Sequence, residues 1–197
     1  MLALSVAAGL ACEEPKPLPG TEEPTQVKGP REYLALLNES GIDRAKLPHV
    51  EMVVKGKGKV VFELVPQLAP KTCARIMQLI DQRYYDGQRF HRVENWVVQW
   101  GDPQSKEPNW KELHLGTKGT GTIIDFDDNW IRQDRGVLAM ARTSEEKNGD
   151  SQMYVLKRST PQLTHDYVAF GWTIEGMDVM DKIAVGDVIE SMKITQR

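Results

Sequence analysis

The stretch Tyr85-Asp86-Gly87-Gln88-Arg89-Phe90-His91-Arg92-Val93, followed closely by Gln99-Trp100-Gly101-Asp102-Pro103, carries the strongest signal in this sequence. A distant stretch, Asn148-Gly149-Asp150-Ser151-Gln152-Met153-Tyr154, again combines a glutamine with an aromatic residue. Two apolar, strand-like runs of this kind, with one Arg beside the first, indicate a shallow apolar pocket that holds a few fixed hydrogen-bond donors. Such a pocket suits a proline ring with its polarisable amide.

Short strand-like segments dominate the chain after Val50. Apolar residues alternate over 50–54 and 60–64 around a Gly-Lys turn, which predicts an antiparallel hairpin. A helix is expected from Pro70 through Ile80, because proline is tolerated in a first turn, and a second around 177–183. Further strands are expected at 89–93, 96–100, 136–141, 153–156, 168–172 and around 192–194. Many short strands with few helices predict a mainly β fold, either a barrel or a sandwich.

Composition limits the classes of function. The chain has 197 residues, 40% of them hydrophobic, which fits one domain of ordinary size and a tail. The net charge is −3 and no Lys/Arg block occurs, so nucleic-acid binding is not expected. Asp125, Asp127 and Asp128 lack the glycine and terminal glutamate of an EF-hand loop, which favours a solvated turn over a calcium site. No metal site is predicted.

The two cysteines differ in context, so a disulfide between them is not expected. Cys73 shares one face of the expected helix with Ile76, Met77 and Ile80, which predicts a buried and unreactive thiol. Cys12 ends an apolar, small-residue stretch, and it requires a separate explanation.

Residues 1–12 are expected to be an export signal. The stretch from Leu2 to Ala11 is far too short, as a helix, to cross roughly 30 Å of hydrocarbon. Gly9-Leu10-Ala11-Cys12 resembles the lipobox of bacterial lipoproteins, in which the cysteine is acylated, although no Lys or Arg precedes the apolar core. Lipid anchoring at Cys12, with an exported periplasmic or cell-surface location, is therefore the favoured prediction. A plain secretory signal or a ragged terminus is the alternative.

Residues 13–30 contain five prolines and four glutamates, a composition that cannot bury a core and favours an extended, solvated chain. At about 3.1 Å per residue this segment could reach roughly 50 Å, so it is predicted to be a tether. Residues 31–48 are predicted to be a short helical extension that stops near Gly41, because apolar residues recur there at helical spacing.

Four motifs together resemble the cyclophilin-type peptidyl-prolyl isomerases, and the third of them has a bacterial character. These motifs are Phe90-His91-Arg92-Val93, Gln99 to Pro103, Gly136-Val137-Leu138-Ala139-Met140-Ala141-Arg142-Thr143, and Ser151-Gln152. The resemblance runs from about Val50 to Thr195, so residues 49–197 are predicted to be one such domain. It implies a closed eight-stranded antiparallel barrel capped by two α-helices. It also implies peptidyl-prolyl cis-trans isomerase activity (EC 5.2.1.8) on proline-containing polypeptide clients, without a cofactor.

The resemblance assigns roles to individual residues. Arg92 and Gln99 become the catalytic pair, with Gln99 helping to orient Arg92. From periodicity alone, Tyr154 would be assigned to core packing, and an isolated Arg92 to a surface salt bridge. The implied substrate-binding positions are Trp96, Val97, Ala141, Arg142, Gln152, Tyr154, Leu163 and Tyr167.

The chemistry expected of Arg92 follows from the prolyl amide. Its rotation barrier is about 18–20 kcal/mol because the nitrogen lone pair is delocalised into the carbonyl. In the twisted transition state the nitrogen becomes pyramidal and accepts a hydrogen bond, so a fixed guanidinium donor binds that state preferentially. A guanidinium stays charged at every relevant pH, which predicts a flat pH profile near neutrality.

Three departures from the family pattern are visible. The turn between Arg92 and Trp96 is one residue shorter than usual and reads Glu94-Asn95. The usual Gly-Thr-rich run is replaced by residues 104–115, beside the expected subsite for residues that precede proline. Gln162 stands where cyclosporin-sensitive members carry Trp, which predicts weak cyclosporin binding.

A second class of function stays open at this point. The domain could be a chaperone or scaffold module that binds proline-containing segments with little turnover. The shortened turn and Trp96, which stands where the family usually has Phe, make that alternative possible.

Overall fold

The computed structural model describes residues 37–129, 131–142 and 148–196. The predicted signal, Cys12, the tether and most of the expected helix between 31 and 40 lie outside these residues. Residues 37–39 are helical and the Leu37 side chain is fully buried.

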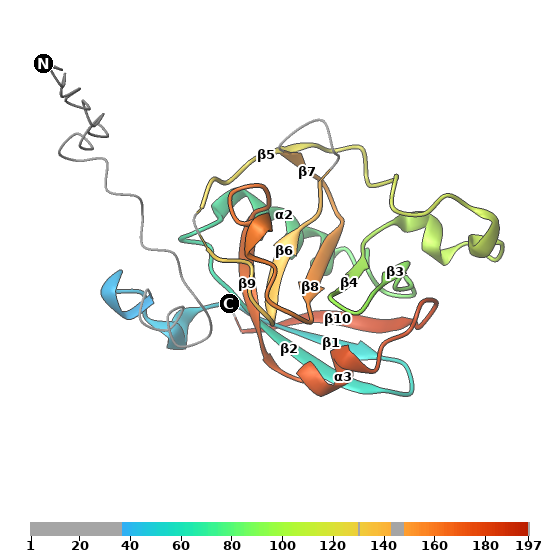
Figure 1. Ribbon diagram of the computed structural model, residues 1–197, viewed down its shortest axis with the longest axis horizontal. Coiled ribbons are helices and arrows are strands. Elements are labelled where there is room, and N and C mark those ends of the chain that lie inside the picture. The colour runs from blue at the N-terminus through green and yellow to red at the C-terminus, as the bar shows by residue number, and fades with distance from the viewer. Residues whose placement is uncertain (1–36, 130, 143–147, 197) are drawn as a thin grey trace, which may run out of the picture.

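The observed elements follow the expected order (Figure 1). The hairpin, the helix that begins at Pro70 and the short helix at Met177 are confirmed, and 3-10 turns occur at Arg44–Lys46, Pro103–Lys106, Trp110–Glu112 and Pro161–Leu163. The helices and strands are β1 (His49–Val54), β2 (Gly58–Leu64), α2 (Pro70–Asp81), β3 (Arg92–Val93), β4 (Val97–Trp100), β5 (Ile124–Asp125), β6 (Val137–Met140), β7 (Asn148–Gly149), β8 (Met153–Leu156), β9 (Ala169–Glu175), α3 (Met177–Asp181) and β10 (Ile189–Gln196).

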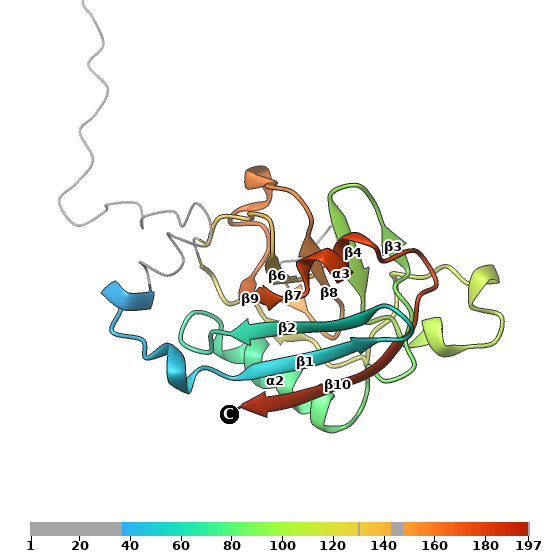
Figure 2. The same ribbon diagram turned by 90° about the horizontal axis from the view of Figure 1, so that it is seen from below.

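Eight of these strands form one curled antiparallel sheet in the order β10-β1-β2-β9-β6-β8-β4-β3 (Figures 1 and 2). The prediction of a closed barrel is wrong: within the described residues, no strand pairing joins the two edge strands, β10 and β3. The β3 strand has only two residues, and both pair with β4. Backbone hydrogen bonds between 87–90 and 186–189 and a single bridge from Arg89 to Val188 span part of the gap.

Apolar residues fill both faces of the sheet. On the concave face, α2 buries Cys73, Ile76 and Ile80 against the strands, as its helical spacing predicted. Leu79, which was not predicted, is buried with them, whereas Met77 is only partly buried. Trp100 packs there against Phe62, with ring centroids 6.1 Å apart. A second apolar cluster on the other face contains, among others, Leu37, Leu47, Val65, Val97, Ala139, Tyr154 and Leu156. Residues 37–48 therefore cover one part of this outer face, while another part is left for a pocket.

Asp127 is not in a solvated turn, which corrects the interpretation of the acidic run. Its carboxylate is buried and accepts hydrogen bonds from the backbone N–H (2.7 Å) and the hydroxyl (2.8 Å) of Thr72, in the first turn of α2. The residue at the N-cap position, Ala69, provides no side-chain cap of its own. Asp127 therefore caps α2 from a distant part of the sequence. Asp125 and Asp128 are exposed.

The extension at residues 43–48 lies beside the last strand. The Gln196 amide donates hydrogen bonds to the backbone oxygens of Ala45 (2.7 Å) and Leu47 (2.9 Å). Arg44 forms a bidentate ion pair with the buried carboxylate of Glu63 on β2. No helix among the described residues is long and apolar enough to span a membrane.

Candidate functional site

The β3–β4 hairpin positions the central arginine. In its register Arg92 lies opposite Gln99, and Gln99 lies in turn opposite Tyr154 on β8. The Glu94 N–H donates to the Val97 carbonyl at 2.9 Å, which closes the tight turn between the strands. Side chains of residues directly opposite each other on neighbouring strands point to the same face, so Arg92, Gln99 and Tyr154 share one face of the sheet.

A pocket of about 440 Å³ opens at this face. Val97 and Tyr154 are buried in it, whereas Trp96, Leu163 and Tyr167 are partly exposed. Its size suits a short peptide segment, and its mixture of apolar rings with a few polar groups suits a proline within that segment. The lining residues are His91, Arg92, Trp96, Val97, Gln99, Leu115, Gly116, Ala141, Arg142, Tyr154, Leu163 and Tyr167. Every predicted site residue of the domain except Gln152 is in this set.

The aromatic wall of the pocket is fixed and uncharged. The Tyr154 hydroxyl donates to Gln133 Oε1 at 3.1 Å, and its ring meets that of Tyr167 edge-on at 5.6 Å. Burial raises the pKa of Tyr154 well above its ordinary value, so the phenol stays protonated. The Arg142 guanidinium lies over the Tyr167 ring at 5.0 Å, and its Nε donates to the Asp166 carbonyl at 2.6 Å. The charge of Arg142 is thus turned to the edge of the pocket.

Arg92 stands at the rim of the pocket with its guanidinium held on three sides. Its Nε donates to Glu94 Oε1 at 2.7 Å, its Nη1 reaches Gln99 Oε1 at a long 3.5 Å, and its centre lies 5.1 Å from the Trp96 ring. The Trp96 indole N–H donates to the other oxygen of Glu94 at 2.8 Å. Hydrogen bonds from Arg92 first, and then from Trp96, lower the pKa of Glu94. No sequence pattern indicates this role for Glu94, since it depends on side-chain placement.

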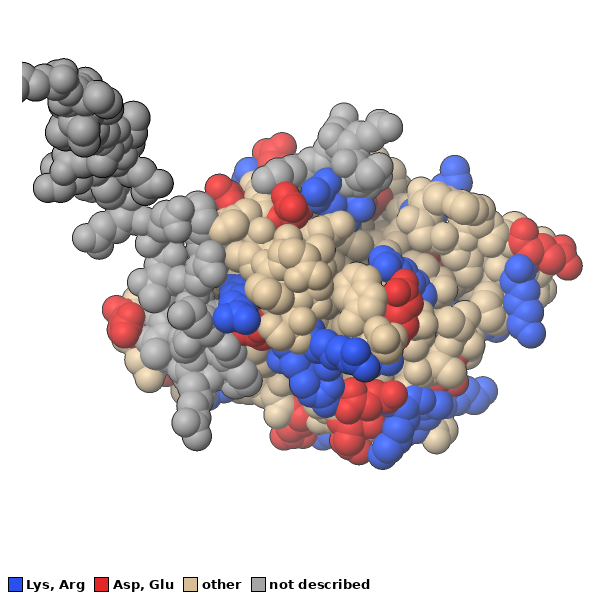
Figure 3. Space-filling model, in the orientation of Figure 1, with Lys and Arg blue, Asp and Glu red and all other residues tan. Residues whose placement is uncertain are grey.

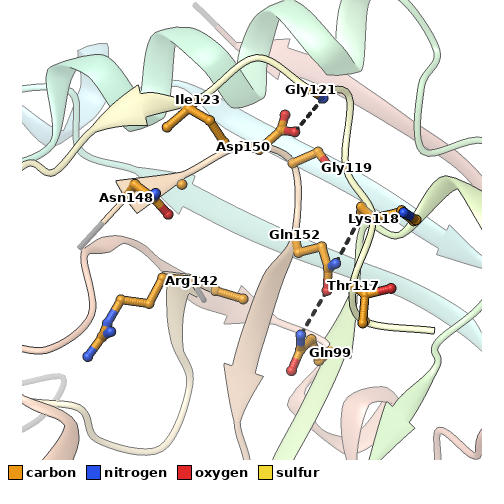
Figure 4. A pocket seen from close by; sticks show the side chains of 14 residues that line it. Gln99, Thr117, Lys118, Gly119, Gly121, Ile123, Arg142, Asn148, Asp150 and Gln152 are labelled. Atoms are coloured by element: carbon orange, nitrogen blue, oxygen red, sulfur yellow. Dashed lines mark hydrogen bonds between the residues drawn. The ribbon is translucent and has the colours of Figure 1, made fainter. Parts of the chain in front are cut away.

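Two glutamines connect the pocket to a second one. Gln99 Nε2 donates to Gln152 Oε1 at 2.9 Å, and Gln152 Nε2 donates to the Lys118 carbonyl at 2.8 Å (Figure 4). The second pocket, of about 350 Å³, shares Gln99, Gly116, Ala141 and Arg142 with the first. Gln152 therefore lies between the two pockets and lines only the second.

The floor of the second pocket is held by ion pairs and hydrogen bonds. The Asp150 carboxylate accepts from the Gly121 N–H at 2.8 Å (Figure 4). It also accepts from the hydroxyl of Thr120 and pairs with Arg75 of α2 at 3.4 Å. Since Asp150 already has these partners, its charge is largely satisfied within the protein. On the face seen in Figure 3, acidic and basic side chains are interspersed around a largely uncharged centre.

Buried Asp102 anchors both ends of residues 104–115, the segment that replaces the family's Gly-Thr-rich run. Its carboxylate accepts from the N–H of Gln104 at 2.9 Å, of Gly116 at 2.7 Å and of Lys118 at 3.1 Å. The chain between leaves the sheet as a long excursion after β4 (Figure 1). It returns at the pocket, where Leu115 and Gly116 join the lining. The family motifs could not predict these two lining residues, because the segment departs from them.

His91 lies beneath this rim. A Cβ added at Gly116 would meet its ring at 3.6 Å. Burial lowers the pKa of His91, although the nearby charge of Asp102 acts in the opposite direction. His91 is therefore a neutral part of the pocket wall at neutral pH.

A curled antiparallel sheet that carries a partly apolar pocket, with an arginine at its rim, is the architecture of a prolyl isomerase. Residues 49–197 match the family described as "Cyclophilin type peptidyl-prolyl cis-trans isomerase/CLD". The chain belongs to this family and is a peptidyl-prolyl cis-trans isomerase.

Relatives in two bacteria show the extent of the similarity. The "Probable peptidyl-prolyl cis-trans isomerase" of Brucella suis biovar 1 (strain 1330) is 31% identical over 150 residues, which cover 73% of this chain and 76% of the relative. "Peptidyl-prolyl cis-trans isomerase B" of Bacillus subtilis (strain 168) is 30% identical over 139 residues, which cover 69% of this chain and 90% of the relative.

Solved structures agree on the fold. A Cryptosporidium parvum cyclophilin-type isomerase, crystallised in the presence of the dipeptide Ala-Pro, superposes with a TM-score of 0.64 at 25% identity and covers 76% of this chain and 99% of its own. A cyclophilin from Hirschia baltica gives a TM-score of 0.59 at 22% identity, covering 77% of this chain and 74% of its own.

Proposed function

We propose that Arg92 is the catalytic donor of this isomerase, and that its clients are proline-containing segments of proteins outside the cytoplasm. The observation that carries the first part is the placement of Arg92. It lines the partly apolar pocket, and among the described residues its Nη2 has no hydrogen-bond partner. The Nη2 group of Arg92 is thus available to donate a hydrogen bond at the place where a prolyl nitrogen would lie.

The mechanism uses binding and one hydrogen bond. The proline ring packs on Val97, Tyr154 and Leu163, while the flanking peptide stays outside. As the prolyl bond twists, its nitrogen becomes pyramidal and accepts a hydrogen bond from the guanidinium of Arg92, which Gln99 helps to hold. In a partly desolvated site such a bond contributes about 2–4 kcal/mol, or roughly two to three decades in rate.

The test is exchange between cis and trans forms of an Ala-Pro peptide, measured by NMR. We expect Arg92→Ala to lower the accelerated exchange rate by roughly two to three decades. Arg135→Ala is the matched control, because that side chain is 46% exposed and ion-paired, against 45% for Arg92, but lies outside the pocket. Wild-type exchange no faster than that of Arg92→Ala would refute the role. Peptide binding without acceleration would point to the chaperone or scaffold alternative.

The location of the clients is proposed from the sequence. Leu2 to Cys12 has the pattern of an export signal that ends in an acylated cysteine, and residues 13–30 have the composition of a tether. Two or more acyl chains are needed for stable anchoring, at about 0.8 kcal/mol per buried methylene. Intact mass of the membrane-bound protein tests the lipid directly. A mature protein without added lipid, or a Cys12→Ser variant that stays in the membrane fraction, would remove the anchor from the proposal.

Weak cyclosporin binding is also proposed from the sequence. Gln162, at the position where sensitive members carry Trp, is exposed beside the pocket residue Leu163. An amide there cannot supply the apolar contact of an indole ring. Isothermal titration with cyclosporin should show no tight complex, and a nanomolar Kd would contradict this expectation.

A further inference from the structure

The turn after β3 contains a charged side chain at the edge of the pocket. Glu94 uses both of its carboxylate oxygens, one for Arg92 Nε at 2.7 Å and the other for Trp96 Nε1 at 2.8 Å. Since the guanidinium also lies over the Trp96 ring at 5.1 Å, the three side chains form a closed set on one hairpin. The turn containing Glu94 is also where this sequence is one residue shorter than the family pattern.

We infer that Glu94 is a positioning residue of the isomerase, which holds the Arg92 guanidinium against Trp96 so that its free donor is ready for the prolyl nitrogen. This inference rests on the proposed catalytic role of Arg92. It adds that the donor is fixed before the substrate arrives.

Arg92 needs such support because of its length and exposure. An arginine side chain has many rotamers, and this one is 45% exposed at the pocket rim. Gln99 alone holds it weakly, since the distance from Nη1 to Oε1 is 3.5 Å. The short bond from Nε to Glu94 and the contact with the Trp96 ring together restrict the guanidinium plane. What remains without a hydrogen-bond partner within the described residues is Nη2.

A carboxylate beside a catalytic cation also has an opposing effect, because it reduces the positive field at the substrate. Glu94 is itself 45% exposed, so water and salt screen that effect. Water and salt do not remove the restriction that the hydrogen bond to Glu94 places on the position of the Arg92 guanidinium. Positioning is therefore the larger effect, and removal of Glu94 should slow the enzyme.

The fold should tolerate this change. The turn is closed by the backbone bond from Glu94 N–H to the Val97 carbonyl, which does not involve the carboxylate. Exposed ion pairs also contribute little to stability. A loss of activity in a Glu94 variant can therefore be separated from unfolding.

The experiment compares Glu94→Ala, Glu94→Gln and the wild type in the Ala-Pro exchange assay, with thermal unfolding measured alongside. We expect kcat to fall about 5- to 20-fold in Glu94→Ala, with KM nearly unchanged, because a misplaced catalytic group can cost up to about a hundredfold. Glu94→Gln keeps one acceptor oxygen and should recover part of the loss. Glu175→Ala, at an exposed and ion-paired glutamate outside the pocket, is the control and should match the wild type.

Two further readouts test positioning directly. The NMR resonance of the Arg92 Nε–H should lose its downfield, hydrogen-bonded shift in Glu94→Ala. In an Arg92→Ala background, Glu94→Ala should have no added effect on rate. If Arg92→Ala is inactive but Glu94→Ala keeps full kcat, the inference about Glu94 is overturned while the role of Arg92 stands. If the wild type is no faster than Arg92→Ala, both are overturned.

Discussion

Replacing Asp127 by alanine should destabilise the domain by about 2–3 kcal/mol. A lost side-chain cap costs about 1 kcal/mol, and up to about 2 in some proteins. The carboxylate also interacts with the positive end of the α2 dipole, which adds up to about 1–2 kcal/mol in a partly buried position. Its bonds to Thr72, at 2.7 and 2.8 Å, have good geometry, and Ala69 offers no substitute cap.

The assay is thermal and urea unfolding followed by circular dichroism. For a domain of this size each kcal/mol lowers Tm by about 2–4 °C, so Asp127→Ala should unfold about 4–12 °C earlier. Asp127→Asn retains an acceptor without the charge and should lose about half as much. Asp128→Ala changes an exposed neighbour and should stay within about 0.5 kcal/mol of the wild type. Equal stability of Asp127→Ala and Asp128→Ala would refute the capping argument.

Two other predictions concern titrating groups. Burial raises the pKa of the Cys73 thiol to about 12, so iodoacetamide at pH 8 should modify Cys73 only after unfolding; peptide mapping that finds it alkylated in the native protein would contradict its burial. Burial lowers the pKa of His91 from 6.5, so the unfolded chain binds a proton there that the folded chain does not, and stability should fall as pH drops below about 6.5. Urea unfolding at pH 7 and pH 5 should show a smaller decrease for His91→Gln than for the wild type; equal decreases would exclude His91 as a source.

Local patterns predicted most of the elements in this fold. The period-two alternation around Val60 indicated the hairpin, and Pro70 marked the start of α2, because both depend on neighbouring residues alone. The motifs also named residues that the structure brings into one pocket, including Arg92, Tyr154 and Leu163. Periodicity could not have separated Tyr154 from ordinary core, since its ring is in fact buried.

Long-range side-chain contacts are the part that the sequence did not predict. Asp127 caps a helix from a distant loop, and an acidic run gives no sign of such a partner. The partners of Glu94 depend on rotamers within a turn that the family pattern does not contain. Closure of the sheet was predicted by resemblance, but 87–90 and 186–189 meet only through irregular backbone hydrogen bonds and one isolated bridge, which strand patterns in the sequence do not reveal.

The three hydrogen bonds of Asp102 have a consequence for how this protein can change over time. One buried carboxylate joins the first residue after Pro103 to Gly116 and Lys118, so the chain between enters and leaves from a fixed base. Extra loop length costs little closure free energy when the base is fixed in this way. Evolution or a protein engineer can therefore exchange the exposed residues 106–109 and 111–112 beside the proline pocket. Buried Ser105, which bonds to Arg89, and the pocket residue Leu115 would have to be kept. A recognition segment grafted there would give the enzyme a new choice of clients while Arg92 and its neighbours keep their places.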